Sequence, residues 1–384
     1  GDPCPGAPEC VPEGDWSAHL CACPAGSLPH GDTCVDDPCD PNPCSGATGN
    51  RNRCEPDAGA GTFSCSCNMA FEEDPQSPGG PCLPDPNAKD WTFLVYLNAD
   101  NNLESYGYQD LAEMAVAGST ADVDIVVLLD SLTADGGAAR KLYVTPGGST
   151  ELVHLGEIDM GSWQTLADFG AWAVTTYPAR HYALVLWDHG DGWTATAQQG
   201  ALLTKGFSTD DHGSAAGISI ASGDYARALG AITAARGDKL DLVGFDACLM
   251  GMWEVAAASE PFARLLVASE ETIPATGWPY DEILVPLIGD PQMTAAQLGT
   301  TIVDSYFADT TANETLALID LETMAALQAA ISALADALLA HPSLFAAVET
   351  ARQSAQMFYS FDGHRDLVAA VTEIAALPGA QGTL

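Results

Sequence analysis

Cys248 and His189 are the residues of this chain whose side chains could together carry out covalent catalysis. Cys248 is the only cysteine beyond residue 82, and it follows the apolar run Leu240–Asp246; His189 follows a second apolar run, His181–Asp188. A thiol beside an imidazole is a nucleophile with its general base. A single cysteine at the end of a strand is also commonly a small buried apolar residue, so the catalytic interpretation requires the histidine to lie beside it.

Two features next to these residues fit acyl transfer. Gly190 follows His189, and a glycine lets the backbone approach a substrate closely. The backbone N–H groups of Gly190 and Cys248 could then form an oxyanion hole. We also expect a helix to begin at about Leu249, and its N-terminus would lower the pKa of the Cys248 thiol.

The segments around both residues predict strands and helices in alternation. Short apolar runs predict strands at Trp91–Leu97, Val123–Asp130, Lys141–Val144, His181–Asp188, Leu240–Asp246, Leu265–Ser269 and Thr315–Leu321. Helical patterns occupy Leu103–Ala117, Ser162–Tyr177, Gly223–Arg236, Leu249–Ala258, Thr294–Phe307 and Glu322–Ala340. Together they predict an α/β fold with a mostly parallel sheet covered on both faces. Active groups in such folds lie at the carboxyl ends of strands, where the two candidate residues occur.

The charge of the chain limits its partners. It has 13 Lys+Arg against 52 Asp+Glu, a formal net charge of −39, which excludes nucleic acid and anionic membranes as natural partners. The acidic surface either maintains solubility or steers basic substrates toward the protein. The most apolar stretch, Met324–Ala340, is interrupted by Gln328, Ser332 and Asp336, so we expect no membrane span.

The first 88 residues have a different composition from the rest of the chain. Eleven of the 12 cysteines lie before residue 83, among many Gly, Pro and Asp residues. Such a segment needs covalent cross-links because it cannot bury a sizeable core. Zinc is the alternative, but pairs of C-x2-C at finger-like separation are missing. Disulfides formed in an oxidising compartment are therefore expected.

The cysteine spacing from Cys39 to Cys82 resembles that of an EGF-like module. The resemblance implies the disulfides Cys39–Cys54, Cys44–Cys65 and Cys67–Cys82; six cysteines alone allow 15 pairings. The five preceding cysteines match the last five of a second such module, whose first cysteine is missing. This match puts Cys4, Cys21, Cys23 and Cys34 in disulfides and leaves Cys10 without its usual partner. We therefore expect a partial module at residues 1–36, cut from a longer precursor, a module at 37–83 and a linker at 84–90.

Residues 90–384 resemble the clostripain family, within the caspase-like clan of cysteine peptidases. The matching segments are Tyr96–Leu103 (YLNADNNL), Leu186–Gly190 (LWDHG), Gly244–Gly251 (GFDACLMG), Ala268–Glu271 (ASEE) and Gly277–Asp281 (GWPYD). The resemblance implies a caspase-like three-layer sandwich with a mostly parallel sheet over residues 91–384. It also implies that His189 is the catalytic histidine and Cys248 the nucleophile.

The resemblance further implies a substrate class. Asp246 matches the family acid at the base of the primary specificity pocket, where a carboxylate would pair with Arg or Lys. Asp246 could instead cap the following helix. Asp281 is a second pocket candidate with the same alternative.

Processing and cofactors are also implied by the family. Members are often cut between the histidine and the cysteine after a basic residue, and Lys205 is the only lysine or arginine from Gly190 to Gly217; it is either the processing site or an ordinary solvated lysine. The chemistry needs no cofactor. Some members require calcium, but the sequence singles out no metal ligands and contains no EF-hand pattern.

These expectations combine into one leading hypothesis. The chain would be an exported bacterial cysteine endopeptidase, secreted or at the cell surface, that cleaves proteins or peptides after Arg or Lys. Its EGF-like modules would bind a surface or a protein partner. The alternative is a non-enzymatic adhesion or recognition protein that keeps the peptidase fold and uses the modules for binding.

Overall fold

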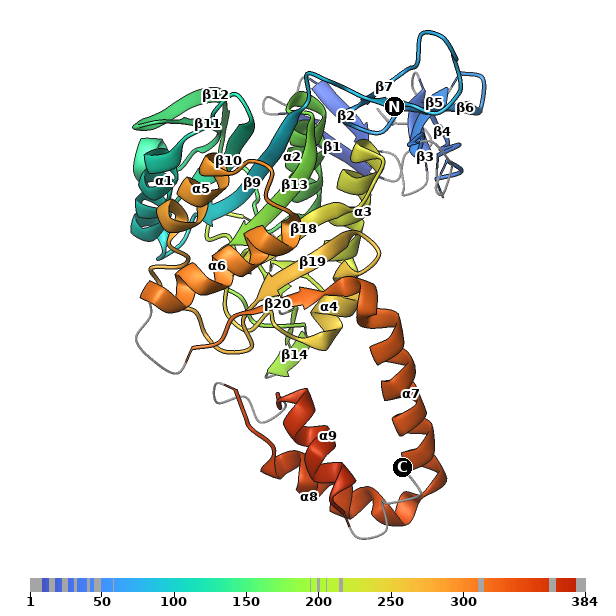
Figure 1. Cartoon of the computed structure of the whole chain (residues 1–384), viewed down its shortest axis with the longest axis vertical. Coiled ribbons are helices and arrows are strands. Elements are labelled where there is room, and N and C mark those ends of the chain that lie inside the picture. Colours follow the sequence, from blue (N-terminus) through green and yellow to red (C-terminus); the bar gives the residue numbers. More distant parts are fainter. Residues whose placement is uncertain are drawn as a thin grey trace.

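The chain forms a large α/β body that carries a small disulfide-linked region and a group of C-terminal helices (Figure 1). The computed structural model describes residues 9–13, 18–22, 27–30, 33–39, 42–44, 50–57, 59–193, 195–198, 201–204, 206–213, 217–309, 314–358 and 364–377.

An eight-stranded sheet forms the centre of the body, in the order β12-β11-β10-β9-β13-β18-β19-β20. Its five central strands are parallel, and the edges are antiparallel. The strands are β9 (Lys89–Ala99), β10 (Val123–Ser131), β11 (Ala139–Thr145), β12 (Gly148–Gly156), β13 (Ala179–Trp187), β18 (Leu240–Asp246), β19 (Ala263–Ala268) and β20 (Ala317–Asp320). The predicted mostly parallel sheet is confirmed.

Helices cover both faces of this sheet, because the central strands are apolar on both sides. Leu94 and Tyr96 of β9 join one buried cluster, and Phe93 and Val95 join the other. The first cluster packs against α2 (Trp163–Thr176), α3 (Asp224–Arg236) and α4 (Trp253–Ser259); the second packs against α1 (Glu104–Ala117), α5 (Tyr280–Gly289) and α6 (Ala295–Asp309). The molecule is thus a three-layer sandwich, as expected.

Short strands connect or precede the main elements. Those of the body after β13 are β14 (Ala195–Gln198), β15 (Ala201–Thr204), β16 (Gly206–Phe207) and β17 (Ile218–Ser219); η1 (Ala134–Gly136) follows β10. Those of the N-terminal region are β1 (Glu9–Glu13), β2 (Ala18–Ala22), β3 (Ser27–His30), β4 (Thr33–Asp36), β5 (Arg53–Asp57), β6 (Thr62–Ser66), β7 (Phe71–Glu72) and β8 (Leu83–Pro84).

The described part of the cysteine-rich region contains three disulfides, Cys39–Cys54, Cys44–Cys65 and Cys67–Cys82. These are the pairings implied by the resemblance to an EGF-like module. The side chains of the five earlier cysteines lie outside the described residues. Strand β9 of the central sheet begins at Lys89, so the last two residues of the expected linker, 89 and 90, belong to this strand.

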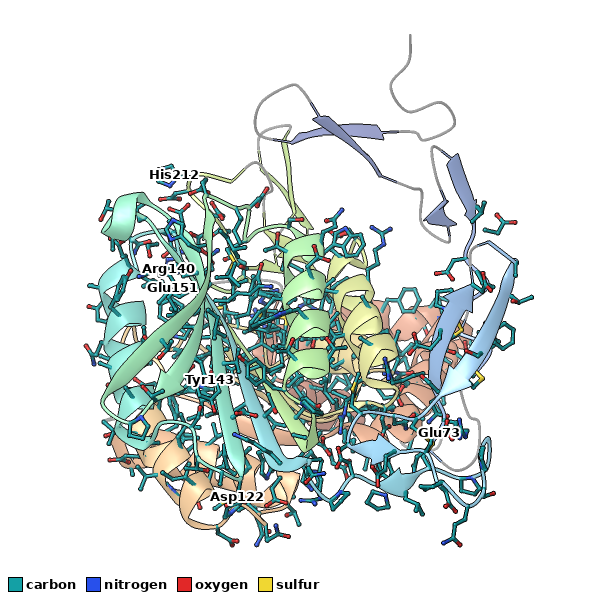
Figure 2. The ribbon with its side chains drawn as sticks, turned by 90° about the horizontal axis from the view of Figure 1, so that it is seen from above. Glu73, Asp122, Arg140, Tyr143, Glu151 and His212 are labelled. Carbon is teal, nitrogen blue, oxygen red and sulfur yellow. A yellow bond between two sulfur atoms is a disulfide. The ribbon has the colours of Figure 1, made fainter. Side chains whose placement is uncertain are left out.

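The region with these disulfides packs against the C-terminal end of α3. Arg53 Nε donates to the carbonyl of Ala235 at 3.0 Å, and the N–H of Met69 donates to the carbonyl of Arg236 at 2.9 Å. The end of α3 precedes β18, so these contacts lie near the amino ends of the strands. Figure 2 shows the labelled Asp122, before β10, and His212 at opposite ends of the sheet.

Three helices follow β20 and extend beyond the sheet (Figure 1). They are α7 (Met324–Ala340), α8 (Phe345–Ser354) and α9 (Leu367–Ala375), with the short turns η2 (Leu321–Thr323) and η3 (Pro342–Leu344). Within the described chain, the 20 residues Leu321–Ala340 have the length and composition of a membrane-spanning helix, with a mean hydropathy of 1.5 and 6% of the window buried. Length and composition alone do not establish a membrane span, so the expectation of none stays a prediction.

Candidate active site

The structure brings the loops after β13 and β18 together at the carboxyl edge of the sheet. The two strands are neighbours, with Trp187 opposite Asp246. The N–H of Asp188 donates to the carbonyl of Asp246 at 3.3 Å, which continues the pairing past the end of β13. His189 directly follows Asp188, and Cys248 lies two residues after Asp246. Both side chains are partly exposed. Parallel neighbouring strands thus place the predicted base and nucleophile on adjacent loops.

Gly190 lies directly against the backbone of Cys248. A Cβ atom added at residue 190 would lie 2.2 Å from the Cys248 carbonyl oxygen and 3.1 Å from its nitrogen. Gly190 also bridges Phe207, through hydrogen bonds of the Asp191 N–H and the His189 carbonyl. This bridge does not use the Gly190 N–H. The arrangement is compatible with the expected oxyanion hole.

The loop after β18 differs from the expectation of an immediate helix. Leu249 has a left-handed φ of 63°, and the N–H of Gly251 donates to the Ser269 carbonyl at 2.6 Å. The helix α4 therefore begins only at Trp253, too far along the chain to lower the thiol pKa of Cys248. Burial instead raises the pKa of this thiol, although the N–H of Ile273, 3.3 Å from Sγ, favours the thiolate.

His189 has a partner that the sequence analysis did not identify. Its Nε2 atom lies 2.9 Å from Oδ1 of Asn102, which fixes one side of the imidazole. Burial lowers the pKa of His189, while Asp191 and Asp211 act in the opposite direction. Asn102 belongs to the family-like segment Tyr96–Leu103, and this was the one signal that could have pointed to it.

Asp246 is buried and does not cap α4. Its Oδ2 atom accepts hydrogen bonds from the Trp278 N–H and the Tyr280 hydroxyl, each at 3.0 Å. The glycine before Trp278 is required here, because Gly277 has a φ of 64° and a Cβ on it would lie 2.7 Å from Asp246 Oδ2. Burial raises the pKa of Asp246 despite both hydrogen bonds.

A second buried acid, Asp110 of α1, lies beside Asp246. Burial and the charge of Asp246 raise its pKa. Its Oδ2 accepts a hydrogen bond from the Trp187 indole at 2.6 Å, whereas its Oδ1 is buried with no hydrogen-bond partner. Among the described residues, the charged groups that affect the pKa values of this pair are all acids. The site therefore holds two carboxyl groups without a cation.

The remaining predicted site residues lie elsewhere or outside the description. Asp281 is in the first turn of α5, and its Oδ1 accepts from the N–H of Glu282; the acid beside Asp246 is Asp110. Lys205 lies outside the described residues. A separate group of acids at the carboxyl edge, around Asp100, could hold a metal ion.

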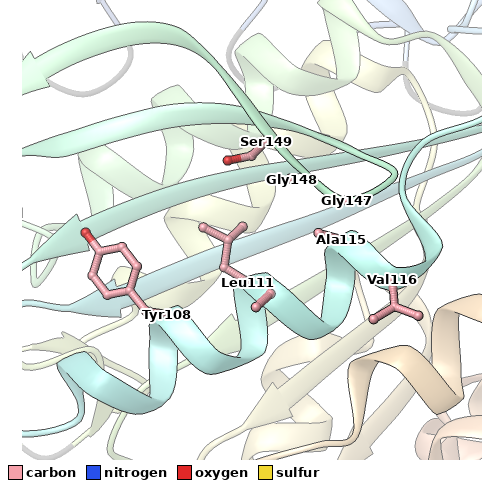
Figure 3. Close-up of a pocket in the computed structure, with 8 residues that line it drawn as sticks. Tyr108, Leu111, Ala115, Val116, Gly147, Gly148 and Ser149 are labelled. Carbon is pink, nitrogen blue, oxygen red and sulfur yellow. The ribbon is translucent and has the colours of Figure 1, made fainter.

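A hollow that contains no predicted site residue lies between α1 and the β11–β12 turn (Figure 3). It has a volume of about 470 Å³ and is lined by Tyr108, Leu111, Ala112, Ala115, Val116 and Gly147–Ser149. Its mostly apolar lining offers no nucleophile and no base, so it is not part of the candidate active site.

The comparisons with known proteins agree on one family. The model of the clostripain family matches residues 95–368. Clostripain of Hathewaya histolytica is 27% identical over an alignment of 223 residues, and the match covers 50% of this chain and 41% of the relative. The chain thus spans less than half the length of this curated relative.

Two crystal structures share the fold. A secreted C11 cysteine protease from Bacteroides thetaiotaomicron, in complex with an irreversible peptide inhibitor, has a TM-score of 0.55 at 20% identity, over 74% of this chain and 78% of that one. An inactive zymogen C11 protease from Parabacteroides distasonis has a TM-score of 0.51 at 19% identity, over 75% and 78%. With the family model matched over most of its length, this chain belongs to the clostripain family.

Proposed function

We propose that this protein is an exported cysteine endopeptidase that cleaves peptide bonds after Arg or Lys. The observation that carries the proposal is that His189 and Cys248 occupy adjacent loops after two neighbouring strands, near a buried pair of carboxyl groups. Membership of the clostripain family and the disulfides of the N-terminal region support peptidase activity and export, respectively.

The two pKa shifts define how the reaction would begin. Burial raises the pKa of the Cys248 thiol and lowers that of His189, so the resting pair is a neutral thiol and a neutral imidazole. His189 then removes the thiol proton as Sγ attacks the substrate carbonyl. The N–H groups of Gly190 and Cys248 stabilise the oxyanion.

The tetrahedral intermediate would collapse to an acyl-enzyme. The imidazolium of His189 donates its proton to the leaving amine, and the carbonyl carbon stays bonded to Cys248 Sγ. Water, deprotonated by the same imidazole, attacks the thioester and releases the carboxylic acid and the thiol. Asn102 holds the ring in place through both half-reactions.

Specificity would come from Asp246 together with Asp110. A carboxylate pair in a buried site attracts a guanidinium or an ammonium group strongly and repels an acidic side chain. The unpartnered Oδ1 of Asp110 supports this assignment, because a buried acceptor without a hydrogen bond costs free energy until a donor arrives. Asp281 would not take part in this pocket, because the acid beside Asp246 is Asp110.

Activation would involve cleavage after Lys205, the only lysine or arginine between Gly190 and Gly217. The variant Lys205→Ala should stay a single chain during maturation, whereas the wild type is cut. Mixing active enzyme with Cys248→Ala protein separates cleavage in trans from cleavage in cis. An uncut wild type that is fully active would remove Lys205 from the proposal.

The decisive experiment compares two fluorogenic peptides that differ only in Arg or Asp before the scissile bond. The wild type should hydrolyse the Arg peptide alone, and Cys248→Ala should hydrolyse neither. Turnover of neither peptide by the wild type, with calcium, reductant and cleavage after Lys205 verified, would favour a non-enzymatic binding protein that uses its EGF-like modules.

A further inference from the structure

The loop of residues 269–273, directly after β19, packs against the loop that carries Cys248. The N–H of Leu249 donates to the Glu271 carbonyl at 3.1 Å. The N–H of Gly251 donates to the carbonyl of residue 269 at 2.6 Å, and a Cβ added at Gly251 would lie only 2.6 Å from that carbonyl carbon. The two loops are therefore in direct backbone contact.

The same loop contacts the nucleophile itself through Ile273. The N–H of Ile273 lies 3.3 Å from Cys248 Sγ, and the Ile273 carbonyl oxygen lies 3.7 Å from the same sulfur. The carbonyl accepts from the neutral thiol, and the N–H donates to the thiolate. A hydrogen bond to the charged form lowers a pKa, so the Ile273 N–H opposes the rise that burial causes in the pKa of Cys248.

The hydroxyl group of Thr315 is bonded to the start of this loop. Thr315 lies two residues before β20, the edge strand that pairs with β19. Its Oγ1 atom accepts from the N–H groups of Glu270 and Glu271, each at 3.0 Å. It also lies 3.0 Å from Oγ of Ser269, whose side chain is fully buried. One side chain thus contacts three consecutive residues of the loop.

The directions of the hydroxyl hydrogen bonds follow from the groups present. Because Thr315 Oγ1 already accepts two N–H groups, its own proton goes to Ser269 Oγ. The Ser269 proton then goes to the Glu271 carbonyl at 2.9 Å. This carbonyl also accepts from Leu249, the residue after Cys248. A chain of three hydrogen bonds therefore connects Thr315 to the nucleophile loop.

We propose that Thr315 is a positioning residue for the nucleophile. It fixes the loop of residues 269–273, and this loop places the Ile273 N–H beside Cys248 Sγ. The effect of Thr315 on peptide cleavage rests on the proposed function, whereas its effect on the thiol does not depend on any substrate.

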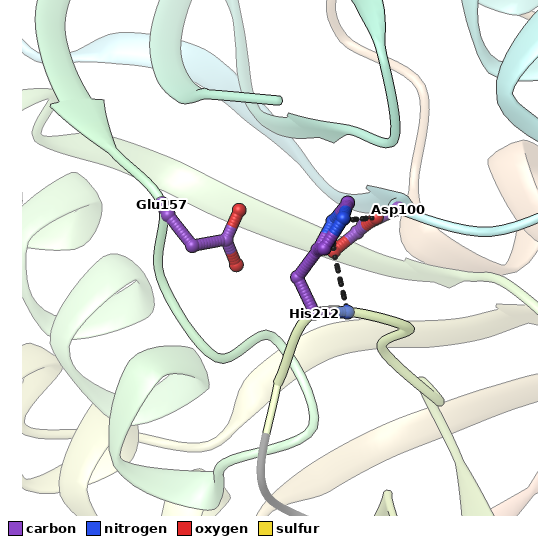
Figure 4. A group of neighbouring side chains, drawn as sticks. All are labelled: Asp100, Glu157 and His212. Atoms are coloured by element: carbon purple, nitrogen blue, oxygen red, sulfur yellow. Dashed lines mark hydrogen bonds and ion pairs between the residues drawn. The ribbon is translucent and has the colours of Figure 1, made fainter. Parts of the chain in front are cut away.

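The histidine side of the site has separate support. In the loop after β16, the N–H of Ser208 donates to the His189 carbonyl at 3.4 Å. The same loop is held by His212, whose Nδ1 lies 2.9 Å from Asp100 Oδ1 (Figure 4). Because these contacts are separate from those of Thr315, a change at Thr315 should act on the thiol and leave the imidazole in place.

The direct test is the rate of alkylation of Cys248 by iodoacetamide in the full chain, followed by peptide mass mapping from about pH 5 to pH 11. Thr315→Val removes the hydroxyl group at nearly constant volume. The Ile273 N–H should then move away from Sγ, so the profile should shift to higher pH. At pH 7 the rate should fall about 3- to 10-fold, the effect of one hydrogen bond. The charged groups that raise the pKa of this thiol, Asp246 and Asp191, are unchanged in the variant.

Two matched variants separate positioning from packing. Thr315→Ser keeps the hydroxyl and loses the methyl group, so its alkylation profile should match that of the wild type. Thr300→Val makes the same replacement at an exposed threonine of α6, whose hydroxyl donates to the Ala296 carbonyl of its own helix, and should also match the wild type. An unshifted profile in Thr315→Val, or an equal shift in Thr315→Ser, would overturn the proposal.

A second position guards against a variant that merely fails to fold. Ser269→Ala interrupts the same chain of hydrogen bonds one step nearer to the nucleophile, and its profile should shift in the same direction. Thermal unfolding should show both variants within about 4 °C of the wild type, as for one lost hydrogen bond. If Thr315→Val does not fold, an unshifted profile in a folded Ser269→Ala would contradict the proposal by itself.

Cleavage of the Arg peptide gives an independent measurement. In Thr315→Val kcat should fall roughly tenfold or more with little change in KM, because the nucleophile is misplaced while the acids of the pocket stay in position. If the wild type cleaves no peptide, the proposed function fails, and the alkylation profiles still decide the role of Thr315. A change in KM alone would contradict a positioning role.

Discussion

At the scale of single residues, the catalytic pair is distinguished by its neutral resting state. His189 has a pKa below its ordinary value of 6.5 and Cys248 has one above its ordinary value of 9.0, both because of burial. Between these limits thiol and imidazole are both uncharged. Cysteine peptidases that preform a thiolate–imidazolium pair have the opposite order of pKa values.

This order predicts the pH dependence of cleavage. As the pH rises, His189 loses its proton and becomes a base, so kcat/KM for the Arg peptide should increase along an acid limb whose midpoint lies below pH 6.5. The measurement is kcat/KM at constant ionic strength from pH 4 to pH 10, approximately the range in which the pair titrates. A midpoint at or above pH 7 would contradict the assignment of His189 as a buried neutral base.

Asn102 is predicted to act by positioning His189. In Asn102→Ala the imidazole loses its hydrogen bond to Oδ1, so kcat should fall roughly 10- to 100-fold with little change in KM. In Asn102→Asp a carboxylate replaces the amide and raises the pKa of His189, so the acid limb should move to higher pH. If the acid limb of Asn102→Asp lies at the same pH as that of the wild type, Asn102 does not position His189.

Asp110 should carry a cost in stability that burial and the charge of its neighbour Asp246 impose. Because its pKa in the folded protein is raised, the folded state keeps a proton that the unfolded chain loses above about pH 4, and stability falls as the pH rises. Asp110→Asn removes this penalty and should raise the free energy of unfolding at pH 8 by on the order of 1–3 kcal/mol. The difference should vanish near pH 3.

The variants Asp246→Asn and Asp110→Asn test substrate specificity in cleavage assays. Asp246→Asn should abolish the preference for Arg and Lys, because Asp246 is the acid assigned to the base of the pocket. Asp110→Asn should only weaken the preference, because Asp246 remains. If both variants keep the full preference of the wild type for Arg over neutral side chains, the pair is structural.

At the scale of elements, two loops leave neighbouring parallel strands and meet through their backbones. The loop after β18 turns back at Leu249 and pairs with Ser269 before α4 begins. The loop after β13 runs close enough to Cys248 that only a glycine fits at residue 190. Main-chain contacts between the two loops therefore position the proposed active site, and these loops carry the side chains of His189 and Cys248.

Gly190→Ala tests this element-scale contact. The added methyl group would overlap the Cys248 carbonyl and push the loops apart, so kcat/KM should fall about 100-fold or more, as for a displacement of about 1 Å. Gly289→Ala is a suitable control, because an added Cβ there meets nothing within 4 Å. Near-normal cleavage by Gly190→Ala would mean that the loops are further apart during catalysis.

At the scale of the whole molecule, the disulfide-linked region and the catalytic loops lie at opposite ends of β18. Arg53 and Met69 contact the end of α3, just before the strand begins, and Cys248 follows the end of the strand. The described part of the disulfide-linked region therefore lies away from the proposed site.

This separation predicts independent behaviour of the two parts. Replacing Cys67 and Cys82 with serine should open the N-terminal region to added protease, because it has few buried apolar residues of its own. Hydrolysis of a small Arg peptide should stay within about twofold of the wild type. A parallel loss of peptide hydrolysis would show that the region also supports the catalytic sheet.

Much of the fold follows from the sequence alone. The strands β9, β10, β13 and β18 are continuous apolar runs, and their burial on both faces follows from that pattern. The order of strand, helix and strand required a parallel sheet, and a parallel sheet collects its loops at one edge. His189 and Cys248 could therefore be assigned to that edge without coordinates.

The partners of these residues were decided only by the tertiary structure. Asp110 has the pattern of a solvated acid in the sequence of α1, yet it is buried beside Asp246 and accepts a hydrogen bond from Trp187 of β13. Asn102 comes from the loop between β9 and α1, which no local pattern connects to His189. Sequence periodicity determines which face of an element is buried, because burial of apolar area is a local property of the pattern. Which polar groups share a site depends on contacts between distant segments, and these exist only once the chain is folded.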